Sequence, residues 1–211
     1  MARVLKGNVN MYKTEVYSRQ KLIAQTFEGP SVCLEEMLDA REHRASLQKD
    51  LLAHAPKNSS LLSMTLRIPG PHKSSYVLRH VFDAVRLAVD EALETLQSTT
   101  PIKLDGATGP EMLEIVKINA DTLKRTMVDI EESHPLGSIV DLDVFDANSC
   151  ELRPLSRTEI GYPARSCLIC GGPAKLCARS RTHSVEEMQE AIALIIQASF
   201  AQERGLKDRV Y

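Results

Sequence analysis

The stretch "HPLGSIVDLDVFD" (residues 134–146) places three aspartates in an apolar run of the kind that forms a buried strand. Side chains of a strand alternate between its two faces, and those expected to face the core are Val140, Leu142 and Val144. Asp141 and Asp143 then share the opposite face. Burying carboxylates without partners is costly, so the strand predicted at 138–145 must present them either to solvent or to a cation.

On one face of a strand, alternate residues lie roughly 6 to 7 Å apart, at a rise of about 3.3 Å per residue. Carboxylates at that distance repel each other unless a cation lies between them, and Mg²⁺ takes one or two carboxylates together with phosphate oxygens. Asp141 and Asp143 are therefore predicted to be catalytic ligands of Mg²⁺ in phosphoryl or nucleotidyl transfer. The alternative is an exposed edge strand with solvated aspartates.

The composition is that of a globular protein with one sizeable core, because the chain has 211 residues and 43% of them are hydrophobic. Its formal net charge of −2 gives no global basicity that would favour nucleic acid. No stretch approaches the roughly 18 to 20 apolar residues that a membrane helix needs. The N-terminus lacks the apolar core of a signal peptide, so we expect a cytoplasmic protein that binds neither membranes nor nucleic acid.

The pattern of apolar residues predicts an α+β fold, with a mixed β-sheet flanked by helices. Helical spacing and capping residues predict helices at about 31–53, 75–96 and 120–132 and a terminal helix from 184. Apolar and alternating runs predict strands at 61–68, just after Thr100, at 112–118 and 138–145, and a partner strand near 150–155. We interpret residues 1–28 as a lead-in and 29–211 as a single catalytic domain, whose Cys-rich segment 156–183 is loop-like.

Three polar side chains interrupt the apolar side of the first predicted helix. Arg41, Arg44 and Gln48 follow one another at i, i+3 and i+7, which makes a continuous stripe on a helix with 3.6 residues per turn. A buried guanidinium without a partner is prohibitively costly. The stripe therefore either forms ion pairs with buried acids, for instance with Asp146, or lines a polar cavity that receives an anionic substrate.

The loop "IPGPHKSS" (68–75) joins a predicted strand to the N-terminus of a helix. Free backbone amide groups at such a position suit a phosphate, and Lys73 adds positive charge, so Lys73 and Ser74 are candidate substrate-binding residues. The glycine spacing of a Walker loop is absent. The alternative is a Pro-Gly turn in which a serine caps the helix.

The segment "CLICGGPAKLCARSRTH" (167–183) gathers soft metal ligands. The chain has five cysteines, and in a reducing compartment clustered cysteines favour a metal or plain packing over disulfides. The four candidate ligands of a structural Zn²⁺ are Cys167, Cys170, Cys177 and His183. Their spacing matches no common zinc finger, and the alternative is a cluster of reduced cysteines packed in a loop.

Residues 151–183 also carry six basic and two acidic side chains, a local charge of +4 in a nearly neutral protein. A basic patch of this kind attracts polyphosphate or an acidic partner. Arg165, Arg179 and Arg181 are therefore predicted to face the phosphates of a substrate.

Five stretches together closely resemble one family across residues 29–188. They are "GPSVCLEEMLDAREHRASLQ", "SMTLRIPGPHKSS", "ATGPEML", "LKRTMVDIEESHPLGSIVDLDVFD" and "LSRTEIGYPARSCLICGGPAKLCARSRTHSVEEM". The sequence is similar to the apo-citrate lyase phosphoribosyl-dephospho-CoA transferases, also called citrate lyase holo-acyl-carrier-protein synthases. The first 28 residues and the C-terminal tail lie outside the resemblance.

The resemblance implies transfer of a 2'-(5''-phosphoribosyl)-3'-dephospho-CoA group from its 5''-triphosphate precursor, triphosphoribosyl-dephospho-CoA. The acceptor would be a serine of the acyl carrier (gamma) subunit of citrate lyase, and diphosphate would leave. Asp141 and Asp143 would hold Mg²⁺ across the α-phosphate and the leaving group, and one of them would help to deprotonate the serine. By analogy with the transferase of malonate decarboxylase, which has a similar D-x-D pair, the sheet would be nucleotidyltransferase-like.

Two other functions remain open on the sequence. A zinc-stabilised RNA- or protein-binding module would use the basic Cys-rich segment as its contact and would show salt-sensitive affinity for nucleic acid, although few aromatic residues (4%) are available for base stacking. A nucleotidyltransferase with another acceptor would share the aspartates and lack the other family stretches.

Overall fold

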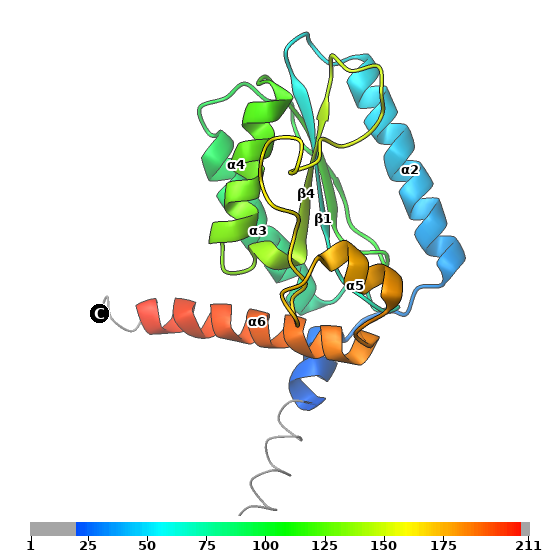
Figure 1. Cartoon of the computed structure of the whole chain (residues 1–211), viewed down its shortest axis with the longest axis vertical. Coiled ribbons are helices and arrows are strands. Elements are labelled where there is room, and N and C mark those ends of the chain that lie inside the picture. Colours follow the sequence, from blue (N-terminus) through cyan, green and yellow to red (C-terminus); the bar gives the residue numbers. More distant parts are fainter. Residues whose placement is uncertain (1–19, 208–211) are drawn as a thin grey trace, which may run out of the picture.

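The computed structural model describes residues 20–207, and its centre is a four-stranded sheet with helices on both faces (Figure 1). The strands are β1 (Ser60–Leu66), β2 (Ile102–Leu104), β3 (Glu111–Val116) and β4 (Val140–Asp146), in the order β2-β3-β1-β4. The helices are α2 (Leu34–Ala53), α3 (Tyr76–Leu93), α4 (Ala120–Ser133), α5 (Ala174–Ser180) and α6 (Val185–Lys207). Residues 20–26 are also helical, and the 3₁₀ turn η1 (Gly137–Ile139) precedes β4.

The α+β class is confirmed, but every pairing in the sheet is antiparallel where a mixed sheet was expected. The connectivity explains the difference. Helix α3 joins β1 to β2 and helix α4 joins β3 to β4, so each helix links two strands that run in the same direction. In both cases another strand lies between the linked pair, β3 in the first and β1 in the second. The strand–helix–strand pattern is therefore present, but the two strands that it links are not adjacent in the sheet and form no parallel pair.

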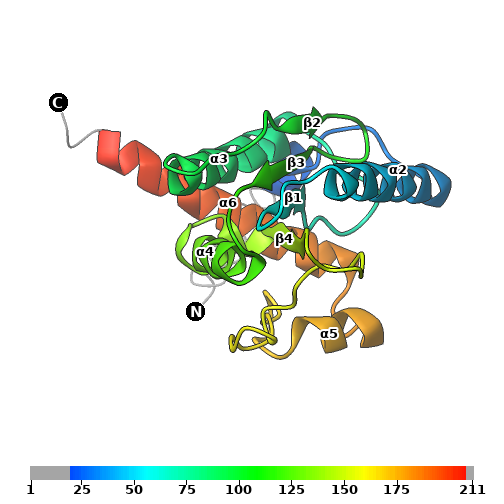
Figure 2. The ribbon, with the colours of Figure 1, turned by 90° about the horizontal axis from the view of Figure 1, so that it is seen from above.

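The main hydrophobic core lies on the face of the sheet that α3 and α4 cover (Figure 2). Helix α3 presents a regular apolar stripe to it, which comprises Leu78, Val81, Phe82, Val85, Val89 and Leu93. Helix α6 adds Ile192, Ala193 and Ile196. Phe27 is also buried in this core, so the last part of the predicted lead-in packs against the domain; residues 1–19 lie outside the described residues.

A smaller apolar cluster lies on the opposite face, under α2. It consists of Leu61, Leu113, Ile115 and Phe145, and the α2 residues packed against it are Leu47, Leu51 and Leu52. These residues come from the C-terminal half of α2. The N-terminal half, with Arg41 and Arg44, therefore lies over a part of the sheet that is polar, and this is where the site forms.

Two local expectations changed. Residues 150–155 form no strand, although the N–H of Leu155 donates to the carbonyl oxygen of Val144 at 2.7 Å. The segment expected to be loop-like contains α5. The start predicted for the terminal helix is confirmed by a capping box, in which Ser184 and Glu187 exchange side-chain to backbone hydrogen bonds of 2.7 and 3.1 Å. In residues 20–207, no helix combines the length and the apolar character that crossing a membrane requires.

Candidate active site

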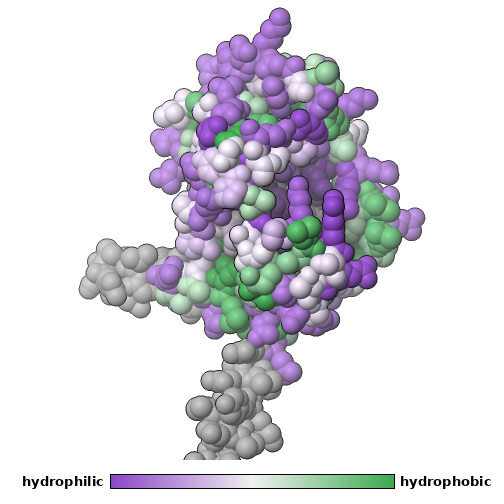
Figure 3. All heavy atoms as spheres, in the orientation of Figure 1, coloured by the Kyte–Doolittle hydropathy of each residue, from purple (hydrophilic) through white to green (hydrophobic). Residues whose placement is uncertain are grey.

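The two aspartates of β4 lie on the face of the sheet predicted from the alternation of the strand. Val140, Leu142 and Val144 are fully buried in the core, whereas Asp141 and Asp143 point to the α2 side and line one cavity of about 590 Å³. We call this the aspartate cavity. In Figure 3 the surface between the sheet and α2 is a hydrophilic hollow; residues of α2 line a second, neighbouring cavity there.

Strand β4 is an edge strand, and its outward backbone groups are satisfied by side chains and, at Val144, by the backbone N–H of Leu155. Leu142, between the two aspartates, donates its N–H to Glu131 at 3.0 Å and accepts from the ammonium group of Lys124 at 2.8 Å. The carbonyl oxygen of Val140 accepts from Arg165 at 2.8 Å. An exposed edge would be open to pairing with another chain; here helix α4 closes it and fixes the backbone that carries the aspartates.

The sequence interpretation missed Lys124 and Glu131, which are 5% and 6% exposed. Their signal was available, because both fall on the inner side of α4 next to Leu123 and Met127, as Arg41 and Arg44 do on their helix. Glu131 also binds Arg157 at 3.3 Å and forms an ion pair with Arg165. It is therefore a buried acid that compensates two basic residues of the Cys-rich segment.

The two aspartates differ in their partners. Asp141 forms ion pairs with Arg165 at 3.0 Å and with Arg67 at 3.5 Å. Within residues 20–207, no hydrogen bond or ion pair is made to the carboxylate of Asp143. Burial, and then the negative charge of Asp141, raise the pKa of Asp143. A half-buried carboxylate with no donor beside a second carboxylate fits a divalent cation, which would remove both causes of that shift.

Arg67 is the third residue that the sequence interpretation missed. It lines the aspartate cavity and two further cavities, of about 360 and 510 Å³. Its guanidinium is fixed by the carbonyl oxygen of Ser138 at 3.0 Å and by Asp141. Burial, and then the charge of Arg165, lower its pKa. An arginine at the junction of three cavities can bridge groups of one substrate that occupy more than one of them.

The cavity of about 360 Å³ lies under the N-terminal half of α2, and we call it the arginine cavity. Its lining includes Arg41, Arg44 and Lys73. Arg44 forms an ion pair with the buried Glu111, so the acid that compensates it is Glu111 and not Asp146. Burial, and then the charge of Arg41, lower the pKa of Lys73. Two cations that repel each other in one cavity favour an anionic ligand.

The other predicted substrate-binding residues occupy varied positions. Gln48 is buried and donates to the hydroxyl of Ser63 at 3.1 Å, and Ser74 is 1% exposed; neither lines the three cavities. Arg181 lines the cavity of about 510 Å³, between the Cys-rich segment and α6. Arg179 is exposed and lines none of the three.

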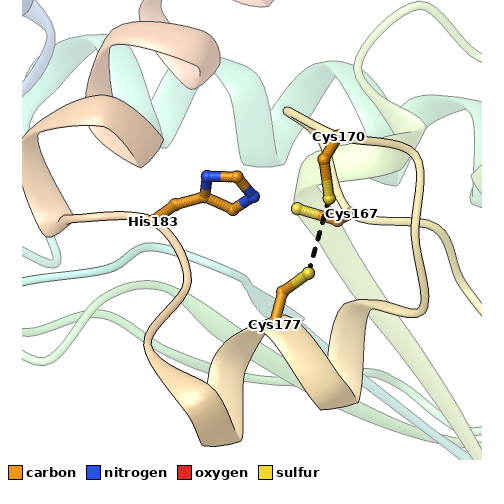
Figure 4. A group of neighbouring side chains, drawn as sticks. All are labelled: Cys167, Cys170, Cys177 and His183. Atoms are coloured by element: carbon orange, nitrogen blue, oxygen red, sulfur yellow. Dashed lines mark hydrogen bonds between the residues drawn. The ribbon is translucent and has the colours of Figure 1, made fainter.

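The four candidate zinc ligands converge (Figure 4). One ligand atom from each of Cys167, Cys170, Cys177 and His183 lies within 4.8 Å of all the others, as the ligand atoms of a tetrahedral site do. The buried Nε2 of His183 has no hydrogen-bond partner in the part of the chain that the structure describes. Backbone N–H groups of Cys170 and Ile169 point to the sulfur of Cys167 and lower the pKa of that thiol. The cluster is compatible with Zn²⁺, which would join α5 to the turn at 167–172.

Comparison with known proteins decides the family. A family model described as apo-citrate lyase phosphoribosyl-dephospho-CoA transferase matches residues 32–199. The chain belongs to this family. The match contains both aspartates of β4, the arginine cavity and the whole cysteine cluster, so all three lie inside the region that defines the transferase family.

Individual members of the transferase family agree with this placement. A probable apo-citrate lyase phosphoribosyl-dephospho-CoA transferase of Streptococcus pyogenes serotype M18 is 41% identical over 174 residues, which are 82% of this chain and 90% of that protein. The apo-citrate lyase phosphoribosyl-dephospho-CoA transferase of Shigella flexneri serotype 5b is 35% identical over 170 residues, covering 79% and 90%. Protein CitXG of Haemophilus influenzae is 38% identical over 188 residues, covering 87% of this chain and 39% of that protein.

Proposed function

We propose that this transferase attaches 2'-(5''-phosphoribosyl)-3'-dephospho-CoA to a serine of the citrate lyase acyl carrier subunit and releases diphosphate. The donor is the 5''-triphosphate precursor of that group. The observation that carries the proposal is the pair Asp141 and Asp143 on an open face of the sheet, beside the arginine cavity. Membership of the apo-citrate lyase transferase family supports the substrate class.

The arginine cavity is the proposed site of the triphosphate. Arg41 has no ion-pair partner among residues 20–207, and its charge already disfavours the charged form of Lys73. A polyphosphate would relieve that repulsion and would gain charge-assisted hydrogen bonds from both side chains. Arg44 contributes less to the ligand, because its charge is taken up by Glu111.

Asp141 and Asp143 are the residues that would hold Mg²⁺. When bound there, the ion neutralises negative charge on the phosphates and favours departure of diphosphate. Asp141 is also the carboxylate to which Arg67 and Arg165 are bound. A phosphate placed beside Asp141 would therefore lie within reach of two guanidinium groups, which stabilise charge in the transition state of phosphoryl transfer.

The acceptor serine would approach through the aspartate cavity. Its oxygen forms a bond to the α-phosphorus of the donor while the bond from that phosphorus to the diphosphate oxygen breaks, and the serine proton leaves. Asp143 is the better placed of the two carboxylates to accept that proton, because no guanidinium pairs with it among residues 20–207, whereas Asp141 is paired with Arg67 and Arg165.

The proposal is tested by incubating the protein with Mg²⁺, triphosphoribosyl-dephospho-CoA and the purified acyl carrier subunit, and by following diphosphate release. Release in proportion to the carrier subunit is expected. A carrier variant with the acceptor serine replaced by alanine should give no release above background. Release that is independent of the carrier, or none with the intact carrier, would contradict the proposal.

A further inference from the structure

Helix α5 forms one wall of the aspartate cavity and is the outermost element over it (Figure 2). Ala174, Lys175 and Ala178 line the cavity, while Cys177 belongs to the metal-ligand cluster. At 100° per residue, Leu176 lies on the side of this short helix opposite Ala174 and Ala178, and Arg179 lies between Leu176 and Lys175. Leu176 is 61% exposed and Arg179 is also exposed, so this side faces solvent at the entrance to the cavity.

The solvent side of α5 combines hydrophobic and hydrophilic surface (Figure 3), and its exposed polar residues include basic side chains. Leu176 and Ile169, which is 41% exposed in the adjoining turn, supply the apolar surface. No ion pair to Lys175, Arg179 or Arg181 is present in the described part of the chain. The segment 174–183 contains no acidic residue at all. Exposed Leu beside unpaired Arg and Lys is the composition of a protein-binding surface for an acidic partner.

The surface is also held in place. The Sγ atoms of Cys170 and Cys177 form a hydrogen bond of 3.5 Å that joins the turn at 167–172 to α5, and the N–H of Cys167 donates to the carbonyl oxygen of Gly172 at 2.6 Å. Rigid presentation lowers the entropic cost of binding a partner. A short helix on the outside of the molecule gains little stability from core packing. The contacts that fix α5 in place are therefore better explained by the surface that the helix presents to a partner.

Building on the proposed function, we infer that the outer side of α5, with Leu176, Arg179 and the adjoining Ile169, is the docking surface for the acyl carrier subunit. The partner contributes an acidic protein surface, and its serine passes over α5 into the aspartate cavity. A nucleic acid is disfavoured as the occupant, because residues 163–184 contain no Phe, Tyr or Trp on which bases could stack.

The test uses the full chain with the double substitution Leu176→Ser and Arg179→Glu. The KM for the carrier subunit should rise about tenfold or more, since a rim charge and its apolar neighbour act mainly on association, while the Kd for the triphosphate donor stays within about twofold of wild type. The matched control is Leu87→Ser with Lys49→Glu. Leu87 is 60% exposed on α3 and Lys49 is exposed on α2, and this variant should keep the wild-type carrier KM.

Ionic strength gives a second readout. The wild-type carrier KM should rise between 0.05 and about 0.5 M salt, because exposed charges are screened over this range, and the double variant should lose most of that dependence. The docking surface would be overturned if the wild type transfers the group and the folded double variant keeps the carrier KM and the salt dependence of the wild type. The proposed function would then still stand. Absence of transfer by the wild type would instead reject the proposed function. Salt-sensitive RNA binding that the same variant abolishes, with carrier KM unchanged, would also overturn the inference.

Discussion

Replacing Glu131 by alanine should destabilise the protein far more than replacing its neighbour Glu132. The side chain of Glu131 is 3% exposed, accepts the N–H of Leu142, and pairs with Arg157 and Arg165, which are 13% and 20% exposed. Removing it leaves one backbone donor without its acceptor, and it leaves Arg157 and Arg165 only their more exposed partners, Glu132 and Asp141. Breaking a buried ion pair on one side costs about 3 to 5 kcal/mol.

For a chain of this size, 1 kcal/mol shifts the melting temperature by about 2 to 4 °C, so Glu131→Ala should melt about 6 to 20 °C below wild type in thermal unfolding followed by circular dichroism. Glu132 is 49% exposed and pairs with Arg157 at 3.2 Å. Its loss should cost about 0 to 1 kcal/mol, as for other surface pairs. If the two variants melt within about 2 °C of each other, Glu131 does not hold the edge of β4 in the way described.

Three further predictions concern the site itself. Arg41→Ala should weaken donor binding in calorimetry without changing the melting temperature. Arg44→Ala should lose about 3 to 5 kcal/mol of stability, because it leaves the buried Glu111 without its ion-pair partner. The reverse pattern would mean that Arg41 is structural and Arg44 binds the donor. Protein purified without chelator should contain about one zinc per chain. Cys170→Ser should lose the metal and melt at a lower temperature. Metal-free protein with full activity would reject the zinc site. Mg²⁺ affinity should fall on acidification, starting above the ordinary range of a carboxyl group because the pKa of Asp143 is raised; an affinity independent of pH would exclude Asp143 as a ligand.

The main elements of the fold could be predicted because their signals are local. The helix at 75–96 and the strand at 138–145 follow from periodicity, and the structure places them at Tyr76–Leu93 and Val140–Asp146. The antiparallel sheet could not be predicted in the same way. A strand–helix–strand pattern indicates that the two linked strands run in the same direction. It does not indicate whether a third strand lies between them. Here the hairpin of β2 and β3 places β3 between β1 and β2.

The site was predictable to the extent that a polar residue on an apolar face has a local signature. That rule identified Arg41 and Arg44, and it would also have identified Lys124 and Glu131, which break the inner side of α4 in the same way. Arg67 gave no such signal, because in the strand predicted at 61–68 it falls on the polar side of the alternation, with Ser63 and Thr65. Its importance arises from the register that places Leu66 opposite Val140 at the start of β4, and pairing across the sheet is not encoded in either strand alone.

The four zinc ligands show the opposite case. Their spacing in the sequence was sufficient to nominate Cys167, Cys170, Cys177 and His183, and the structure brings their ligand atoms within 4.8 Å of one another. Three of the four come from one turn and one short helix, so closing the cluster needs little long-range information. What the sequence did not indicate is that this cluster supports α5 at the entrance to the aspartate cavity.

The most direct test of the account is the intact mass of the acyl carrier subunit after incubation with Mg²⁺, triphosphoribosyl-dephospho-CoA and either wild type, Asp141→Asn or Asp143→Asn. Wild type should add one phosphoribosyl-dephospho-CoA group to each carrier. Both variants should melt close to wild type yet transfer about a thousandfold more slowly, which corresponds to about 4 kcal/mol of transition-state stabilisation. An unmodified carrier with wild type, or near-normal modification by both folded variants, would contradict the assignment of the transfer to the aspartates of β4.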